Sequence, residues 1–249
     1  MAYKQVGEGT KIRLYVEYDL VADEIISLGT SQVHYLRNVL RLMTGDQVAL
    51  FNGRNGEWLA RIHKIGKRQV LLKLIEQSRQ QIPEADIWLL FSPVKKTSNS
   101  YLVQKATELG VSALLPITTQ RTAVDRINLD RLGTTAIEAA EQCRRLTVPA
   151  IRSVLSLDKI LASWPPDRFL LFCDEAGASS PKTALAKGKT GPWAILIGPE
   201  GGFDPKEREM LRRQSFVIPM CLGPRILRTE TAAVAALSIW QVLAGDNQT

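Results

Sequence analysis

The sequence predicts an α/β fold in two parts, a small β-barrel followed by a larger domain with a largely parallel sheet. Residues up to about Gln80 contain short strand-like runs separated by glycine-containing turns, as in small β structures. Beyond this point apolar strand-like runs alternate with helical patterns, which indicates an α/β domain. The last helix is apolar almost all round, so it must be buried in a core or against a partner.

The first domain, residues 1–80, is predicted to consist of four strands and one helix. We expect strands at Lys11–Tyr18, Asp46–Phe51, Glu57–Lys64 and Arg68–Ile75. The turns between the last three carry Asn52-Gly53, Asn55-Gly56 and Gly66. Such residues favour the positive φ angles that tight hairpins require. The helix, Ser31–Leu42, would place on its inner face Val33, Leu36, Leu40 and also Val39.

The second domain, residues 81–249, begins near Pro83, which we interpret as a hinge. Strands are expected at Ile87–Phe91, Val111–Ile117, near Ala150, and at Arg168–Cys173, Trp193–Ile197 and Phe216–Ile218. Helices are expected at Ser98–Leu109, Leu129–Arg145, Leu157–Ala162 and Pro205–Arg213, with a surface loop and at most a short helix over Gly177–Gly191. Strands that alternate with helices in this way form a parallel sheet.

The stretch Leu222–Leu237, LGPRILRTETAAVAAL, joins a special loop to the apolar helix. Gly223 and Pro224 predict a turn, and Thr229 is a candidate N-cap with Glu230 in the first helical turn. From Ala232 to Ala244 only Ser238 and Gln241 are polar. A loop of this kind leading into a buried helix is a common way to hold a ligand.

A second glycine-rich loop, IGPEGGF at Ile197–Phe203, follows an apolar strand and precedes a helix capped by Asp204. Open α/β folds bind ligands at this end of a strand. A tight turn without a ligand is the alternative. The spacing is not GxGxxG, and Gly188-Lys189-Thr190 lacks the earlier glycine of a phosphate-binding loop because Thr183 occupies that position. A dinucleotide site and ATP hydrolysis are therefore disfavoured.

Composition narrows the class of protein further. The net charge of +7 and pI of about 9.4 favour polyanionic partners. The three cysteines form no CxxC pair and there are only two histidines, so we expect no disulfide framework and no metal site. We also expect no membrane segment and a cytoplasmic protein, since no apolar run approaches the ~20 residues of a membrane helix and Met1–Tyr18 lacks a signal core.

Basic residues concentrate in the first domain, which holds 12 Lys and Arg against 8 Asp and Glu. Between Glu57 and Glu76 lie only basic charges, namely Arg61, Lys64, Lys67, Arg68 and Lys73. Across a hairpin they would form a positive edge for phosphates. A solvated edge that prevents aggregation is the alternative. The other candidates for RNA contact are Arg13, Arg37, Arg41, Lys95 and Lys96, with Arg144-Arg145 as an extension, each of which is alternatively a plain surface charge.

At the level of motifs the chain resembles the RsmE family, the small-subunit ribosomal RNA uridine-N3 methyltransferases of the SPOUT superfamily. The resemblance rests on IGPEGGF at Ile197–Phe203, LGPRILRTETA at Leu222–Ala232, QKATELGV at Gln104–Val111, EQCRR at Glu141–Arg145 and HYLRNVLR at His34–Arg41. It implies an N-terminal PUA-like RNA-binding barrel, a C-terminal trefoil knot that holds S-adenosylmethionine, and a homodimer. Small-subunit (16S) ribosomal RNA, in the assembled subunit, would be the substrate.

The resemblance also implies site residues. The cofactor would be surrounded by Ile197, Gly198, Pro199, Glu200 and Gly201 of one loop and by Leu222, Gly223, Ile226, Leu227 and Thr229 of the other. Arg228 and Arg225 are candidates for stabilising negative charge on the uracil oxygens as N3 loses its proton. Glu230 would orient an arginine or relay that proton, with helix-end electrostatics as the alternative.

Two other functional classes remain open at this point. One is a related knotted enzyme that methylates a ribose 2′-hydroxyl or transfer RNA. The other is a non-catalytic, ribosome-associated RNA-binding protein, against which the intact glycines of both loops argue.

Overall fold

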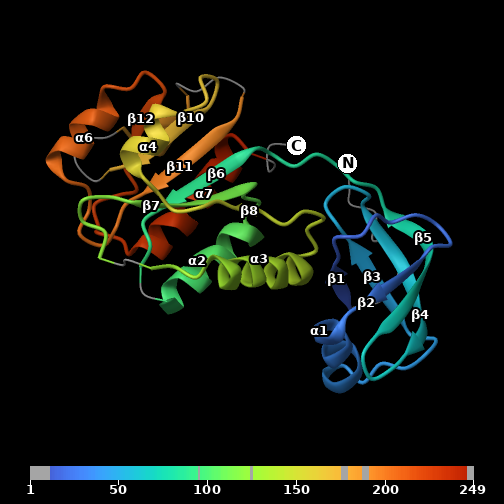
Figure 1. Cartoon of the computed structure of the whole chain (residues 1–249). Coiled ribbons are helices and arrows are strands. Elements are labelled where there is room, and N and C mark those ends of the chain that lie inside the picture. Colours follow the sequence, from blue (N-terminus) through green and yellow to red (C-terminus); the bar gives the residue numbers. More distant parts are fainter. Residues whose placement is uncertain (1–11, 95, 124–125, 175–178, 187–190, 246–249) are drawn as a thin grey trace. The chain divides into compact units, whose positions relative to one another are not determined.

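The structure, a computed structural model, describes residues 12–94, 96–123, 126–174, 179–186 and 191–245. The chain forms two compact units (Figure 1). The N-terminal unit comprises Met1–Pro83 together with Ala140–Val148, and the C-terminal unit comprises Glu84–Ala139 and Pro149–Thr249. The predictions for Lys11, for residues 175–178 and for residues 187–190 concern positions outside the described residues. None of the described helices is long and apolar enough to cross a membrane.

The N-terminal unit is built on a five-stranded sheet in the order β1-β3-β4-β5-β2. Its strands are β1 (Arg13–Tyr15), β2 (Ile25–Leu28), β3 (Gln47–Phe51), β4 (Glu57–Ile65) and β5 (Val70–Arg79). β1 pairs with β3 in parallel and the other pairs are antiparallel. In the described part of the unit the order is a path with two ends, β1 and β2, so a closed barrel is not confirmed.

The helix of this unit differs from the expected regular α-helix. α1 (Thr30–Val33) continues directly into a π-helical turn, η1 (His34–Val39). Val33 and Leu36 are buried as predicted, whereas Val39 is 55% exposed, so its placement on the inner face was wrong. The Leu40 amide donates to the Tyr35 carbonyl, five residues back, and this wider turn rotates Val39 away from the core.

Arg13 ties the segment Ala140–Val148 to the sheet within the N-terminal unit. Its guanidinium donates to Glu57 Oε2 at 2.6 Å and to the carbonyls of Ala140, Glu141 and Arg145 at 2.8, 2.9 and 2.6 Å. These carbonyls lie at and just beyond the end of a helix, where backbone acceptors lack helical partners. Arg13 is therefore a buried structural residue, 8% exposed.

The C-terminal unit contains a wholly parallel sheet in the order β12-β10-β11-β6-β7-β8, with β9 also paired to β7. The strands are β6 (Ile87–Phe91), β7 (Ala113–Thr118), β8 (Ala150–Ile151), β9 (Leu155–Ser156), β10 (Phe169–Cys173), β11 (Trp193–Ile197) and β12 (Val217–Met220). The predicted parallel α/β domain is thereby confirmed. Their apolar runs fit burial on both faces, since Leu89, Leu90 and Phe91 are all fully buried.

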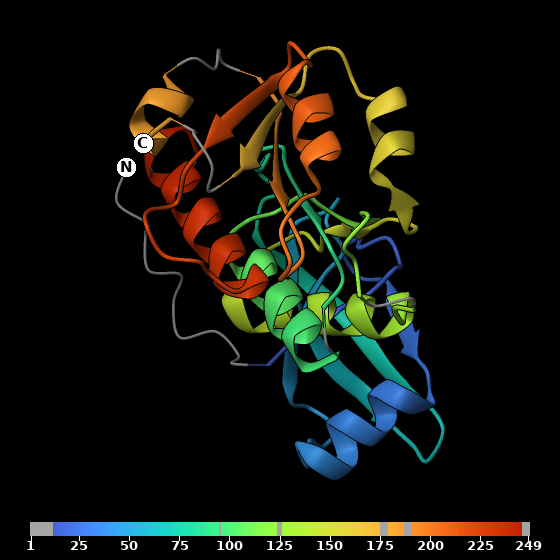
Figure 2. The same ribbon diagram turned by 90° about the vertical axis from the view of Figure 1, so that its left-hand side faces the viewer.

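Helices cover both faces of this sheet. They are α2 (Lys96–Glu108), α3 (Leu129–Cys143), α4 (Leu157–Ala162), α5 (Pro181–Leu185), α6 (Pro205–Arg212) and α7 (Thr229–Leu243). α2 and α7 pack together on one face, and α4 and α6 lie on the other (Figures 1 and 2). The connection from β6 to β7 through α2 and the connection from β11 to β12 through α6 run in opposite directions along the sheet. Because α2 and α6 lie on opposite faces of the sheet, the two connections have the same handedness.

Candidate functional site

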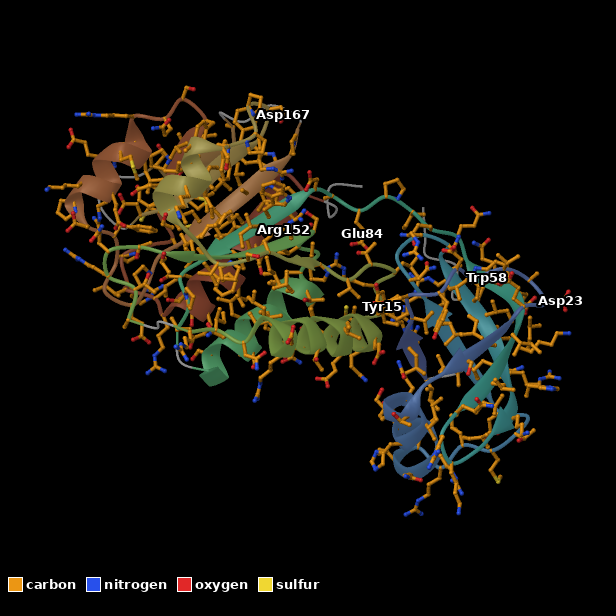
Figure 3. The ribbon with its side chains drawn as sticks, in the orientation of Figure 1. Tyr15, Asp23, Trp58, Glu84, Arg152 and Asp167 are labelled. Atoms are coloured by element: carbon orange, nitrogen blue, oxygen red, sulfur yellow. The ribbon has the colours of Figure 1, made fainter. Side chains whose placement is uncertain are left out.

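The candidate site lies at the carboxyl edge of the parallel sheet, toward which the arrowheads of β6 and β11 point in Figure 1. Two loops leave this edge, residues 198–204 after β11 and residues 221–228 after β12. Asp174 follows β10, which lies between β11 and β12. Asp167 and Arg152, labelled in Figure 3, lie before β10 and after β8 respectively. The edge with the loops is where open α/β sheets place ligands.

The loop after β11 is shaped by two of its glycines. A Cβ at Gly198 would lie 2.5 Å from Cε2 of Phe203, so glycine lets the buried Phe203 ring pack directly against the backbone. That ring meets Phe172 edge to face at 5.0 Å between centroids. Gly202 has a φ of +67° and its amide donates to the Pro199 carbonyl at 2.8 Å, which closes a tight turn.

Polar contacts fix the end of this loop. Asp204 caps α6, as predicted, in a capping box with Glu207. Glu207 is buried and also accepts a hydrogen bond from the Gln120 amide, in the loop after β7. From that loop Arg121 donates to the Gly201 carbonyl at 2.9 Å. The first turn of α6 and the loop after β7 therefore hold the IGPEGGF loop in place.

The second loop is joined to the first by Thr229. Its hydroxyl donates to the Gly198 carbonyl at 3.1 Å, and the residue is 2% exposed. Thr229 was predicted to be the N-cap of the last helix, but that prediction was wrong. Arg228 occupies the N-cap position with extended backbone and no side-chain cap, and Thr229 is the first helical residue. The hydroxyl donates to Gly198 in the loop after β11 and not to its own helix, which no local pattern reveals.

Both loops line one narrow cavity. Of the predicted cofactor residues, those in its wall are Ile197, Gly198, Pro199, Leu222, Gly223, Leu227 and Thr229. Glu200, Gly201 and Ile226 are not in the wall and are exposed, Ile226 by 85%. The cavity volume is about 70 Å³, whereas ligand pockets measure roughly 300–1,000 Å³. A ligand of that size would therefore not be enclosed entirely by this cavity.

The predicted catalytic residues are placed differently from one another. Arg225 lines the cavity, while Arg228 is exposed at the helix N-cap and is not part of the wall. Glu230 points toward α2, where its Oε1 accepts a hydrogen bond from the Ser98 hydroxyl at 3.3 Å. Its Oε2 is buried and has no hydrogen-bond partner among the described residues.

Asp174 is a wall residue for which the sequence suggested no clear role. Its side chain is 1% exposed and forms ion pairs with Arg208 Nη1 at 3.2 Å and Arg212 Nη2 at 2.7 Å, both on α6. Arg208 and Cys173 also line the cavity, with Gly202, Phe203 and Ala232. The available signal was the acidic pair Asp174-Glu175 directly after the apolar run FLLFC, at the sheet edge where ligands bind.

Cys173 does not supply a reactive thiolate. Burial, together with the neighbouring Cys221, raises the pKa of the Cys173 thiol far above its ordinary value. The thiol therefore stays protonated at neutral pH and acts as an apolar wall group.

The predicted RNA contacts separate into exposed and unavailable groups. Arg37, Arg41, Arg61, Lys64, Lys67 and Arg68 are all exposed on the N-terminal unit. Arg13 is buried with its donors engaged, so we exclude it from any phosphate-binding surface. Lys95 lies outside the described residues, as does the side chain of Lys96. Among the residues that the structure describes, no three His, Cys, Asp or Glu side chains are grouped as metal ligands.

Comparison with known proteins defines the class. An RNA methyltransferase domain model matches residues 80–241, and an RNA methyltransferase PUA domain model matches residues 28–75. The chain is thus an RNA methyltransferase with a PUA domain. Among curated proteins, ribosomal RNA small subunit methyltransferase E of Rickettsia conorii is 32% identical over 229 residues, with 91% of this chain and 93% of the relative covered. That of Bacillus subtilis is 31% identical, with 85% and 88% covered. This chain belongs to the ribosomal RNA small subunit methyltransferase E family.

Solved structures agree with this assignment. A methyltransferase from Legionella pneumophila in complex with S-adenosylmethionine has a TM-score of 0.85 at 30% identity, with 94% of this chain and 98% of that chain covered. Ribosomal RNA small subunit methyltransferase E from Neisseria gonorrhoeae, bound to S-adenosyl methionine, has a TM-score of 0.86 at 28% identity and the same coverage.

Proposed function

We propose that this protein transfers a methyl group from S-adenosylmethionine to N3 of one uridine in small-subunit ribosomal RNA. The observation that carries the proposal is the cavity at the carboxyl edge of the sheet, formed by two glycine loops that the Thr229–Gly198 hydrogen bond joins. Family membership and two similar structures that contain S-adenosylmethionine support it.

The cavity residues suit such a cofactor. Gly198, Pro199, Leu222 and Gly223 line the cavity, and their backbone groups would bind polar edges of the cofactor. Leu227 and Ala232 would cover its apolar parts. When bound, S-adenosylmethionine supplies a methyl group that is already activated on a sulfonium. The protein then has chiefly to position the acceptor base and control its charge.

We assign control of that charge to the loop arginines. Arg225, in the cavity wall, and Arg228, at the adjacent helix N-cap, would stabilise negative charge on the uracil oxygens as N3 loses its proton. Glu230, held by Ser98, would orient Arg228 or relay the proton. We expect Arg228→Ala to abolish most methyl transfer while cofactor and RNA binding persist. Near-normal transfer with both affinities unchanged would remove Arg228 from the mechanism.

The finer architecture implied by the resemblance forms part of the proposal. α7 follows the edge strand β12 yet packs against β11 and β6 in the middle of the sheet, as expected if the chain threads a trefoil knot of the SPOUT type. Val242 and Leu243, exposed by 61% and 39%, would be covered in a homodimer. Residues 1–80 would act as the PUA-like RNA-binding barrel and 81–249 as the methyltransferase domain.

RNA binding would use the exposed basic residues of the N-terminal unit, above all Arg61, Lys64, Lys67 and Arg68 on the β4–β5 hairpin. On the same unit Asp23, labelled in Figure 3, pairs with Lys73 at 3.0 Å, so Lys73 is partly neutralised. The substrate would be the assembled small subunit in the cytoplasm.

The chemistry is tested by incubating the purified protein with methyl-labelled S-adenosylmethionine and small subunits from cells that lack it. Nucleoside mass spectrometry should find 3-methyluridine, which mapping assigns to one position. Arg228→Ala should give little product, and Thr231→Ala, an exposed position on the same helix, should give the normal amount. Label on a ribose or only on transfer RNA would contradict the assignment of the target, and the absence of label with bound cofactor would indicate a non-catalytic role.

A further inference from the structure

A groove on the C-terminal unit carries an unusual concentration of arginine. It has a volume of about 540 Å³ and runs along α6 and the loop after β7. We call it the arginine groove and define it by Arg121, Arg208, Arg212, Arg213, Glu209 and Phe203. Four positive side chains thus face one negative side chain in its lining.

The arginines of the groove are held in place by carboxylates. Asp174 is buried and forms ion pairs with both Arg208 and Arg212. Arg213 pairs with Glu209, and these side chains are 74% and 65% exposed. Arg121 lies 3.8 Å from Asp204, also near the surface. Exposed pairs of this kind contribute little free energy, so an anionic ligand can readily replace the carboxylate.

The groove adjoins the proposed cofactor cavity on the same compact unit. Phe203 and Arg208 line both. Arg121 also donates to the Gly201 carbonyl in the loop between the two sites. An anion bound in the groove would therefore be fixed relative to the methyl donor by a single folded unit, as accurate positioning of the acceptor requires.

We propose that the arginine groove binds the phosphate backbone of the RNA substrate beside the target nucleotide. This inference rests on the proposed function and names a second RNA-binding surface, on the methyltransferase domain itself. Arginine suits the role because its planar guanidinium matches a phosphate with two parallel hydrogen bonds. Phosphate contacts hold and orient a strand without reading its sequence, so the target base would be selected elsewhere.

The test uses the full-length protein with the charges of Arg121 and Arg213 removed. The double variant Arg121→Gln/Arg213→Gln removes two positive charges, keeps a neutral amide donor at each position, and leaves the ion pairs of Asp174 with Arg208 and Arg212 untouched. Binding of a fluorescein-labelled oligouridylate is measured over a series of salt concentrations. Lys159→Gln, exposed on α4 and outside the groove, is the matched control. A calorimetric titration with S-adenosylmethionine monitors the cofactor site.

Each phosphate contact on a single strand contributes about 0.7 to the slope of log K against log salt concentration. The double variant should therefore make the slope shallower by about 1.4 and weaken RNA binding at low salt roughly three- to tenfold. Cofactor affinity and the Lys159→Gln slope should match the wild type. A double-variant slope equal to that of Lys159→Gln would overturn the proposal and leave the arginines a structural role with Asp174.

Arg213→Gln alone, which touches neither Gly201 nor Asp174, should lower the slope by about 0.7. If the double variant loses affinity for S-adenosylmethionine, the slope measured for Arg213→Gln alone tests the proposal in its place. Failure of the wild type to methylate ribosomal RNA would remove the proposed function but not the slope difference, so the two failures are distinguishable.

Discussion

Gly198→Ala tests the account of the loop after β11. The added Cβ would lie 2.5, 3.0 and 3.1 Å from three carbons of the Phe203 ring, which is closer than carbon atoms approach without a clash. The ring cannot turn aside easily, because it is 3% exposed and packs against the fully buried Phe172. Overpacking of a core costs about 1–3 kcal/mol. At roughly 2–4 °C per kcal/mol for a protein of this size, the melting temperature should fall by roughly 2–12 °C.

Thermal unfolding followed by tryptophan fluorescence measures this effect, with Gly191→Ala as the matched control. Gly191 precedes the same strand, and a Cβ there would meet only the Asp167 carbonyl at 3.7 Å. In a Phe203→Leu background the cost of Gly198→Ala should shrink, because the smaller side chain removes the clash. Equal melting temperatures for the two single glycine variants would refute the steric argument.

Three further results are expected. Asp174→Asn should destabilise the protein by about 2 kcal/mol in chemical denaturation, because its two arginine partners lose a charged acceptor. Gly133→Ala should stabilise α3 by about 1 kcal/mol in the same assay, since its Cβ meets nothing within 4 Å. Burial by itself raises the pKa of the Asp86 carboxyl. The hydrogen bonds from Arg168 and Ser112, together with the charge of Arg168, outweigh this effect, so the pKa of Asp86 lies below its ordinary value. Asp86 thus stabilises the fold above the unfolded pKa of about 3.9 and loses this effect as pH falls through the folded pKa. Asp86→Asn should therefore be destabilising at pH 7 and increasingly neutral below about pH 4.

Elements whose sequence carries its own boundary signals were predicted well. Trp193–Ile197 and Leu157–Ala162 have the predicted bounds. The apolar run of the first ends at Gly198, and the start of α6 was set by Asp204 with Pro205 behind it. Local chemistry determines these boundaries, so a single sequence contains them.

Features that depend on distant contacts were missed. The strand β2 at Ile25–Leu28 is short, follows Asp23 and Glu24, and is defined only by its pairing with β5. The π-helical turn η1, in which the Leu40 amide donates to the Tyr35 carbonyl, was not predicted either. Arg13 was grouped with surface charges because a buried ion pair with Glu57, 44 residues away, leaves no local trace.

The candidate site shows the same division. Glycine-rich loops after strands identified both loops of the cavity, and seven of the ten predicted cofactor residues line it. Asp174 and Arg208 were not singled out because their pairing depends on how α6 lies over β10 and β12. The direction of the Glu230 side chain could not be predicted either, since its hydrogen-bond partner Ser98 is 132 residues away in the sequence.

Calorimetric titration measures whether S-adenosylmethionine binds in the cavity between the two loops. Ala232 lines that cavity at the start of α7, whereas its neighbour Thr231 is exposed. Ala232→Leu should weaken S-adenosylmethionine binding roughly tenfold, because an overlap of about 1.4 kcal/mol changes Kd by that factor. Thr231→Leu should bind like the wild type. Wild-type affinity in Ala232→Leu, or no binding by the wild type itself, would contradict the account.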